Sequence, residues 1–139
     1  MADTKQSEYW PVEQIPNPDR IFYRVHVGQL PQKRLHPGVF REQNGSMSVD
    51  WEKYSTAQES QARAAQPEQN GILALVAGTV RTIEPLEVIH KPIPANRSHS
   101  EVNGIGASDD MRTKVRRTAI RAKLYEYFHD WEIDPFSSA

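Results

Sequence analysis

The chain has 139 residues, of which 37% are hydrophobic and 25% charged, and its formal net charge is -1 at pH 7. This length suits one domain with a core of its own. With 17 basic against 18 acidic residues, the molecule as a whole is not an electrostatic binder of nucleic acid, so any such activity must come from a local patch.

The chain contains no cysteine, which excludes disulfides, thiol catalysis and thiolate metal sites and agrees with a cytoplasmic location. No apolar run approaches the roughly 20 residues of a membrane span, and residues 1–10 lack the apolar segment of a signal peptide. We therefore expect a soluble cytoplasmic protein without a membrane partner, and we expect no cofactor.

We expect a single domain between two tails. Residues 1–19 contain three of the ten prolines and no periodic pattern, which predicts an N-terminal tail, and residues 135–139 form a short C-terminal tail. The segment 20–134 mixes strand and helix patterns. It predicts an α+β fold, in which a small, mainly antiparallel sheet carries a short surface helix and one long C-terminal helix packed on it.

The first predicted strand covers residues 20–27, where apolar and polar residues alternate. Arg24 and His26 share its polar face and could bind phosphate or a nucleotide. Alternatively, this face is simply the solvent-exposed side of a half-buried sheet. A basic loop (28–38) and a short strand (38–42) follow.

The middle of the chain contains sequence motifs of turns and of a helix cap. Asn44-Gly45 predicts the turn of a hairpin over residues 39–51. Thr56 and Glu59 have capping-box spacing, which predicts a solvated helix to about residue 65. Asn70-Gly71 predicts a second turn, and residues 72–77 predict a buried strand. A helical turn is predicted over residues 79–83 and a further strand over residues 86–90. Residues 102–108 are rich in glycine and predict a flexible segment.

Residues 88–101 form the most distinctive stretch, with two prolines that predict an extended, rigid surface loop over residues 91–96. One hypothesis makes this loop a site, in which His90 or His99 is an acid-base residue oriented by Glu101. Asn96 and Arg97 would then bind a ligand, with Arg97 holding an anion. The alternative is a structural loop. The two histidines match no zinc spacing, so we expect no metal site.

The last predicted helix covers residues 109–131, with Ser108 as its N-cap. Its buried stripe consists of Ile120, Leu124, Tyr127, Phe128 and Trp131. Its first half is basic and carries a candidate interface for nucleic acid or an acidic protein surface, made of Arg112, Lys114, Arg116, Arg117, Arg121 and Lys123. The alternative is a solvated face.

Three stretches, Tyr23-Arg24-Val25-His26, Met47-Ser48-Val49-Asp50 and the segment from His90 to His99, resemble a group of small uncharacterised bacterial proteins. This resemblance implies no activity. An arginine on an early strand, a serine on a later one (Ser46 or Ser48) and a glutamate beyond (Glu101) is also similar to the plan of ADP-ribosyltransferase-like folds.

Two functions are therefore open. The first is a small bacterial cytoplasmic binding or accessory protein, which combines a polar histidine, arginine and asparagine loop site with a basic C-terminal helix. The second is a small enzyme that acts on a nucleotide or phosphorylated substrate, with His90 or His99 as acid-base and Arg24 or Arg97 as the anion clamp.

Overall fold

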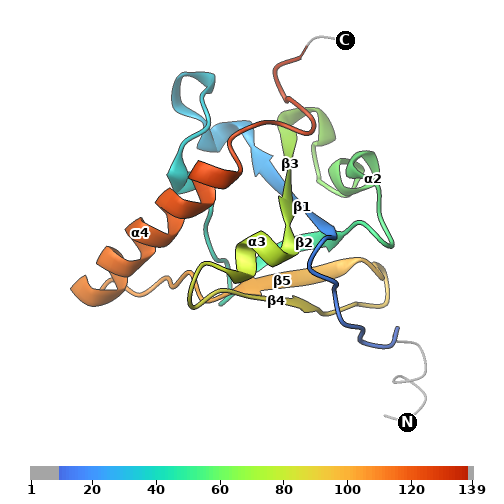
Figure 1. Cartoon of the computed structure of the whole chain (residues 1–139). Coiled ribbons are helices and arrows are strands. Elements are labelled where there is room, and N and C mark those ends of the chain that lie inside the picture. Colours follow the sequence, from blue (N-terminus) through green and yellow to red (C-terminus); the bar gives the residue numbers. More distant parts are fainter. Residues whose placement is uncertain (1–9, 138–139) are drawn as a thin grey trace.

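A computed structural model describes residues 10–137 of the chain, and it confirms the predicted α+β class (Figure 1). Five antiparallel strands form one sheet in the order β3-β1-β2-β5-β4. The strands are β1 (Arg20–His26), β2 (Met47–Trp51), β3 (Asn70–Val76), β4 (Glu87–His90) and β5 (His99–Asn103). The α-helices are α2 (Ala57–Ala62), α3 (Ala77–Arg81) and α4 (Met111–Tyr127). The 3-10 turns are η1 (Val27–Gln29), η2 (Pro31–Lys33), η3 (Pro37–Val39) and η4 (Pro67–Gln69).

One face of the sheet forms the main core. The alternation predicted for β1 is present, with Ile21, Tyr23 and Val25 buried on this face. Helix α4 covers this face through Ile120 and Leu124. The segment that contains η1 to η3 packs between α4 and the sheet. Figure 1 shows α4 running diagonally beside the sheet, with its first turns extending beyond the strands.

The opposite face is mostly polar and is covered at one end only. Phe22 of β1 and Ile72 of β3 pack there against Ala57 of α2 and Ile133 of the C-terminal segment. The C-terminal segment is held by a backbone bridge between Ile72 and Ile133. No second apolar cluster of the described residues covers the rest of this face.

Local cap signals specify two helix starts. The hydroxyl of Thr56 accepts from the amide of Glu59, whose carboxylate accepts from the Thr56 amide, so the predicted capping box of α2 is present. Helix α4 is capped by Asp110, which accepts from the Thr113 amide, whereas we had predicted Ser108 as the cap. Both helices are shorter than predicted at their C-terminal ends.

The predicted hairpin over residues 39–51 is wrong in its first strand. The turn at Asn44-Gly45 is present, with φ of 57° and 90°, but it closes only an isolated bridge between Gln43 and Ser46. Strand β2 pairs with β1 and β5 instead. The Asn70-Gly71 turn is also wrong, because both residues begin β3 and pair with β1.

The predicted extended loop over residues 91–96 is a hairpin turn. Ile93 and Asn96 exchange both backbone hydrogen bonds across Pro94 and Ala95, and β5 begins at His99. The prolines therefore mark a turn between paired strands. The predicted flexible segment 102–108 is wrong at its start, since Val102 is buried in β5.

The N-terminal segment is irregular but packed from residue 10 onward. Ile15 is only 3% exposed and belongs to the main core, and the carbonyl of Asn17 accepts from the Gly78 amide. Residues 1–9 of the predicted tail lie outside the described residues. Across residues 10–137 no helix combines the length and the apolar character of a membrane span.

Candidate functional site on the polar sheet face

The strand pairing places the predicted site residues on two opposite faces of the sheet. His90 lies directly opposite Ser100, so these two share the core face. His99 is next to Ser100 along β5 and therefore points to the polar face. The two histidines nine residues apart cannot act together on one substrate.

His90 is a buried structural residue. Its side chain is 1% exposed and lies edge-on to the ring of Trp51. The Nδ1 atom accepts from the Glu13 amide at 3.0 Å, which leaves the proton on Nε2, 2.7 Å from the carbonyl oxygen of Arg97. Because both ring nitrogens are used by the backbone, His90 has no free nitrogen for proton transfer to a ligand.

Arg97 holds the N-terminal segment in place. Its guanidinium lies 4.0 Å from the ring centre of Tyr54 and 4.7 Å from that of Trp10. It also pairs with Glu13 at 3.7 Å. Hydrogen bonds from Lys53 and Tyr54 hold the pKa of Glu13 below its usual value, against the opposing effect of burial. Arg97 therefore belongs to this packing cluster, away from Arg24.

The polar face is centred on Asp50, which sequence reasoning did not single out as a site residue. Its carboxylate is 3% exposed and accepts from Ser60 at 2.5 Å and from Asn96 at 2.9 Å. It also pairs with Arg24 at 3.1 Å and with Arg63 at 3.2 Å. The three stretches that carried the resemblance thus meet at one carboxylate.

The protonation state of Asp50 follows from this network. Burial raises the pKa of the carboxyl, but the hydrogen bonds from Ser60 and Asn96 and the charges of Arg24 and Arg63 outweigh it, so the pKa lies below its usual value. The carboxylate is charged at neutral pH. It fixes the Nη1 end of Arg24, which also donates to the carbonyl of Ser60 at 3.0 Å.

Beside Arg24 lies a polar cavity of about 230 Å³. Strands β1 and β2 pair only at Ile21 with Trp51 and at Phe22 with Asp50. The cavity lies beyond these pairs, where residues of both strands line it. The lining consists of Tyr23, Arg24, His26, Gln29, Arg41, Gln43, Ser46, Ser48 and Asn70.

The chemistry of this cavity favours an anion. Two guanidinium groups, Arg24 and Arg41, line it, and none of its described lining residues is an Asp or Glu. His26 accepts from the Gly28 amide at 2.8 Å through Nδ1, so its neutral ring carries the proton on Nε2, free to donate. The predicted pair Arg24 and His26 is thus brought together in one concave site.

Ser48 connects the cavity to Glu101. The two residues lie directly opposite each other on β2 and β5. The Glu101 carboxylate pairs with Lys91 at 3.4 Å, and His99 uses Nδ1 toward the carbonyl of Lys91 at 2.8 Å. Glu101 and His99 therefore lie on the same face of the sheet as Ser48, although neither lines the cavity, and Asn96 donates to Asp50 on this face.

The predicted basic interface on α4 is only partly free. The guanidinium of Arg121 donates to the Phe40 carbonyl at 2.7 Å, and that of Arg117 donates to the carbonyls of Gly106 and Ser108. These two arginines attach the helix to the domain. The other four cations are exposed, namely Arg112, Lys114, Arg116 and Lys123.

Several cavity residues gave no usable signal in the sequence. Arg41 lies in a segment predicted as a strand of the hairpin, and Asn70 was assigned to a turn. Asp50 had one signal, a charged residue within an alternating strand, which needs a partner when it is buried. The partners come from positions 24, 60, 63 and 96, so local patterns could not identify them.

Comparison of the chain with protein-family models, with curated proteins and with solved structures found no match in any of the three. Among residues 10–137, no group of three or more potential ligands from His, Cys, Asp and Glu is placed to hold a metal ion. The site therefore has to be interpreted from its own geometry.

Proposed function

We propose that the protein binds a small phosphorylated molecule on the polar face of its sheet. The phosphate would occupy the cavity between β1 and β2, paired with Arg24 and Arg41. The rest of the ligand would lie over Ser48 toward Glu101. One observation supports this proposal above the others, namely a concave site with two guanidinium groups and no lining carboxylate.

The position of Arg24 adds to this support. Asp50 and the Ser60 carbonyl both bind Nη1, so the guanidinium is held in one orientation with its other edge available. A fixed guanidinium loses little entropy when it binds a phosphate. Arg41 is exposed and its contact to the Gly38 carbonyl is 3.4 Å, so it is able to move onto a ligand.

The size of the cavity limits the ligand. Its volume of about 230 Å³ is below the roughly 300–1,000 Å³ of pockets that enclose a drug-sized molecule. A phosphate and the sugar or short chain that carries it fit this space. A nucleotide base would extend over the open face beside Glu101.

Calorimetric titration with inorganic phosphate, ribose 5-phosphate and AMP tests the proposal. We expect binding that is at least tenfold weaker in Arg41→Gln, because one of the two cations is lost. Arg34→Gln is the matched control, since Arg34 is exposed in the same segment and does not line the cavity. No binding by any of the three, or equal affinity of the two variants, would refute the proposal.

A second function is favoured by the arrangement of three residues. Arg24, Ser48 and Glu101 lie on neighbouring strands β1, β2 and β5, and all three share the polar face. This arrangement is similar to the plan of ADP-ribosyltransferase-like folds, which use NAD as the donor. In this version Glu101 would stabilise the ribose cation that forms as nicotinamide leaves. Water or a partner group would then attack that cation.

Release of nicotinamide from NAD measures this activity directly. Glu101→Gln should abolish the release while phosphate binding remains. Glu87→Gln is the control, because Glu87 is an exposed carboxylate on the edge strand β4. If wild-type protein binds phosphate but releases no nicotinamide, the binding proposal stands and the transferase version is refuted.

A further inference from the structure

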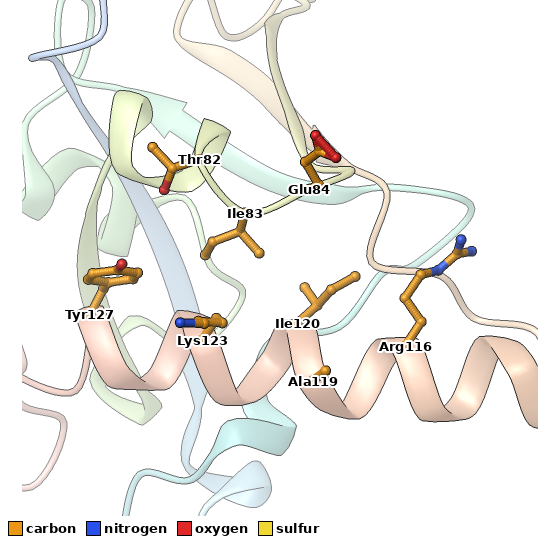
Figure 2. A pocket seen from close by; sticks show the side chains of 8 residues that line it. All are labelled: Thr82, Ile83, Glu84, Arg116, Ala119, Ile120, Lys123 and Tyr127. Carbon is orange, nitrogen blue, oxygen red and sulfur yellow. The ribbon is translucent and has the colours of Figure 1, made fainter.

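A second cavity lies between α4 and the connection that follows α3, apart from the polar sheet face (Figure 2). Its volume is about 280 Å³. Ile83 and Ile120 face each other across it, and Ala119 and Tyr127 extend the apolar lining along the helix. We call it the α3–α4 groove.

Cations flank the apolar floor of this groove. Arg116 and Lys123 both line it from α4, and Glu84 contributes one carboxylate from the opposite wall. Lys123 has a distant partner in Glu126 at 3.9 Å, whereas Arg116 has no ion pair among the described residues. The rim of the groove therefore has a net positive charge.

The basic stripe continues beyond the groove along the helix. Arg112, Arg116, Lys123 and Tyr127 follow one another at spacings of four, seven and four residues and therefore lie along one side of α4. The first half of the helix extends away from the strands (Figure 1). Its apolar residues Met111 and Val115 are 74% and 63% exposed. Arg112 and Arg116 on this part of the helix are exposed and therefore accessible to a partner.

We propose that the α3–α4 groove docks an acidic amphipathic segment of a partner protein. Leucine- or phenylalanine-type side chains would enter the groove against Ile83 and Ile120. Carboxylates beside them would pair with Arg112, Arg116 and Lys123. This is the helix-in-groove mode of recognition, in which apolar anchors recur on one side of the bound segment.

The charge and polarity of the groove favour a protein over nucleic acid. A phosphate backbone uses cations but offers no aliphatic group to an apolar cavity, whereas an acidic amphipathic segment uses both features.

The cations of α4 are placed where they oppose the helix itself. Arg112 is the second residue of α4, close to the positive end of the helix dipole. Arg112 and Arg116 are also four residues apart and repel each other. Helix stability therefore does not account for these charges, whereas an acidic partner does.

A pair of alanines provides the sharpest test. Ala119 lines the groove and Ala122 does not, and both are exposed on the same helix. Ala119→Glu places a carboxylate in the groove, while Ala122→Glu makes the identical change outside it. Melting temperatures that agree between the two variants establish that both are folded.

The probe is a labelled 16-residue peptide with leucines at every third or fourth position and Asp or Glu elsewhere, followed by fluorescence anisotropy. We expect Ala119→Glu to weaken binding at least tenfold and Ala122→Glu to change it less than threefold. The same peptide with amides in place of its carboxylates should bind at least tenfold more weakly.

Two outcomes would overturn the proposal. The first is a peptide that fails to bind or that binds both variants equally. The second is tighter binding of a 16-nucleotide oligonucleotide than of the peptide, with an affinity that falls steeply between 50 and 200 mM salt. That result would identify α4 as a nucleic-acid interface. Neither outcome affects phosphate binding at the polar face.

Discussion

The two charged regions of this molecule are built in opposite ways. Around Asp50 a buried carboxylate receives two hydrogen bonds and two ion pairs from four residues on three separate segments. On the first half of α4 three cations, Arg112, Lys114 and Arg116, are exposed and have no ion pair among residues 10–137. The first arrangement holds the fold together, and the second leaves charges available.

This difference indicates where a charge stabilises the domain and where it serves a partner. A buried carboxylate is tolerated only when its donors are complete, so removing the carboxylate should be costly. An exposed cation near a helix N-terminus opposes the dipole, so removing it should be harmless or favourable. The sign of the change in stability therefore separates the two roles.

Asp50→Ala should have the largest effect. It leaves Arg24, Arg63 and Ser60 without their shared acceptor in a partly buried site. We expect the free energy of unfolding, measured by urea denaturation, to fall by about 3 kcal/mol. Asp130→Ala removes an exposed carboxylate and should change it by less than about 0.5 kcal/mol. Equal losses in the two variants would contradict the structural role of Asp50.

The pH dependence of stability follows from the same network. The pKa of Asp50 is lower in the folded protein than its ordinary value of 3.8, so the unfolded chain binds the proton first. The stabilisation is complete above pH 3.8 and is lost as the pH falls through the folded pKa. Asp50→Asn should show a shallower loss of stability below about pH 4 than wild type, measured by urea denaturation at several pH values. An unchanged slope would show that Asp50 does not contribute to acid unfolding.

His90→Ala should come next, with a loss of about 2 kcal/mol. It creates a cavity beside Trp51 and leaves the Glu13 amide and the Arg97 carbonyl without partners. His26→Ala, on the exposed polar face, should reduce stability by less than about 1 kcal/mol but should weaken phosphate binding. A larger loss of stability in His26→Ala, together with weaker phosphate binding in His90→Ala, would mean that His90 and not His26 binds the ligand.

Local patterns predicted those parts of the fold that depend on neighbours in sequence. The alternation of β1 and the capping box at Thr56 involve residues within a few positions, and both predictions are confirmed. The partner of β2 does not depend on neighbours. We expected it across the Asn44-Gly45 turn, but the structure pairs β2 with β1 and β5, about thirty and fifty residues away. Strand pairing at that distance leaves no local signal.

The candidate site shows the same limit. Sequence order placed His90 and His99 in one loop, whereas antiparallel pairing sends them to opposite faces of the sheet. Arg24 and His26 are close in sequence on one strand, and they do share a cavity. Arg41 and Asn70 reach that cavity through chain reversals that no short-range pattern predicts.

Asp110→Ala should produce a loss of about 1 kcal/mol, because the N-cap of α4 disappears. Hydrogen bonds from Ser108 and Thr113 lower the pKa of this carboxyl to about 2, which reflects its capping role. Because the first turns of α4 are exposed, the loss should appear as local fraying, detectable by faster amide exchange in residues 111–116. Asp109→Ala is the control, since Asp109 is exposed and is not the cap. Equal exchange rates in the two variants would contradict the assigned cap.

Arg112→Glu should have the smallest effect and the opposite sign. The new carboxylate lies near the positive end of the helix dipole and four residues before Arg116, so two unfavourable interactions become favourable. We expect a gain of about 0.5 kcal/mol, equivalent to a rise of about 2 °C in melting temperature.

Arg117→Glu provides the matched comparison five residues along the same helix. Its guanidinium bonds the carbonyls of Gly106 and Ser108, so this variant should lose stability. In about 1 M salt the gain of Arg112→Glu should shrink, because the screening length falls to about 3 Å, while the loss of Arg117→Glu should largely remain. A loss of stability in both variants would show that Arg112 supports the fold, and the charges of α4 would then no longer need a partner to explain them.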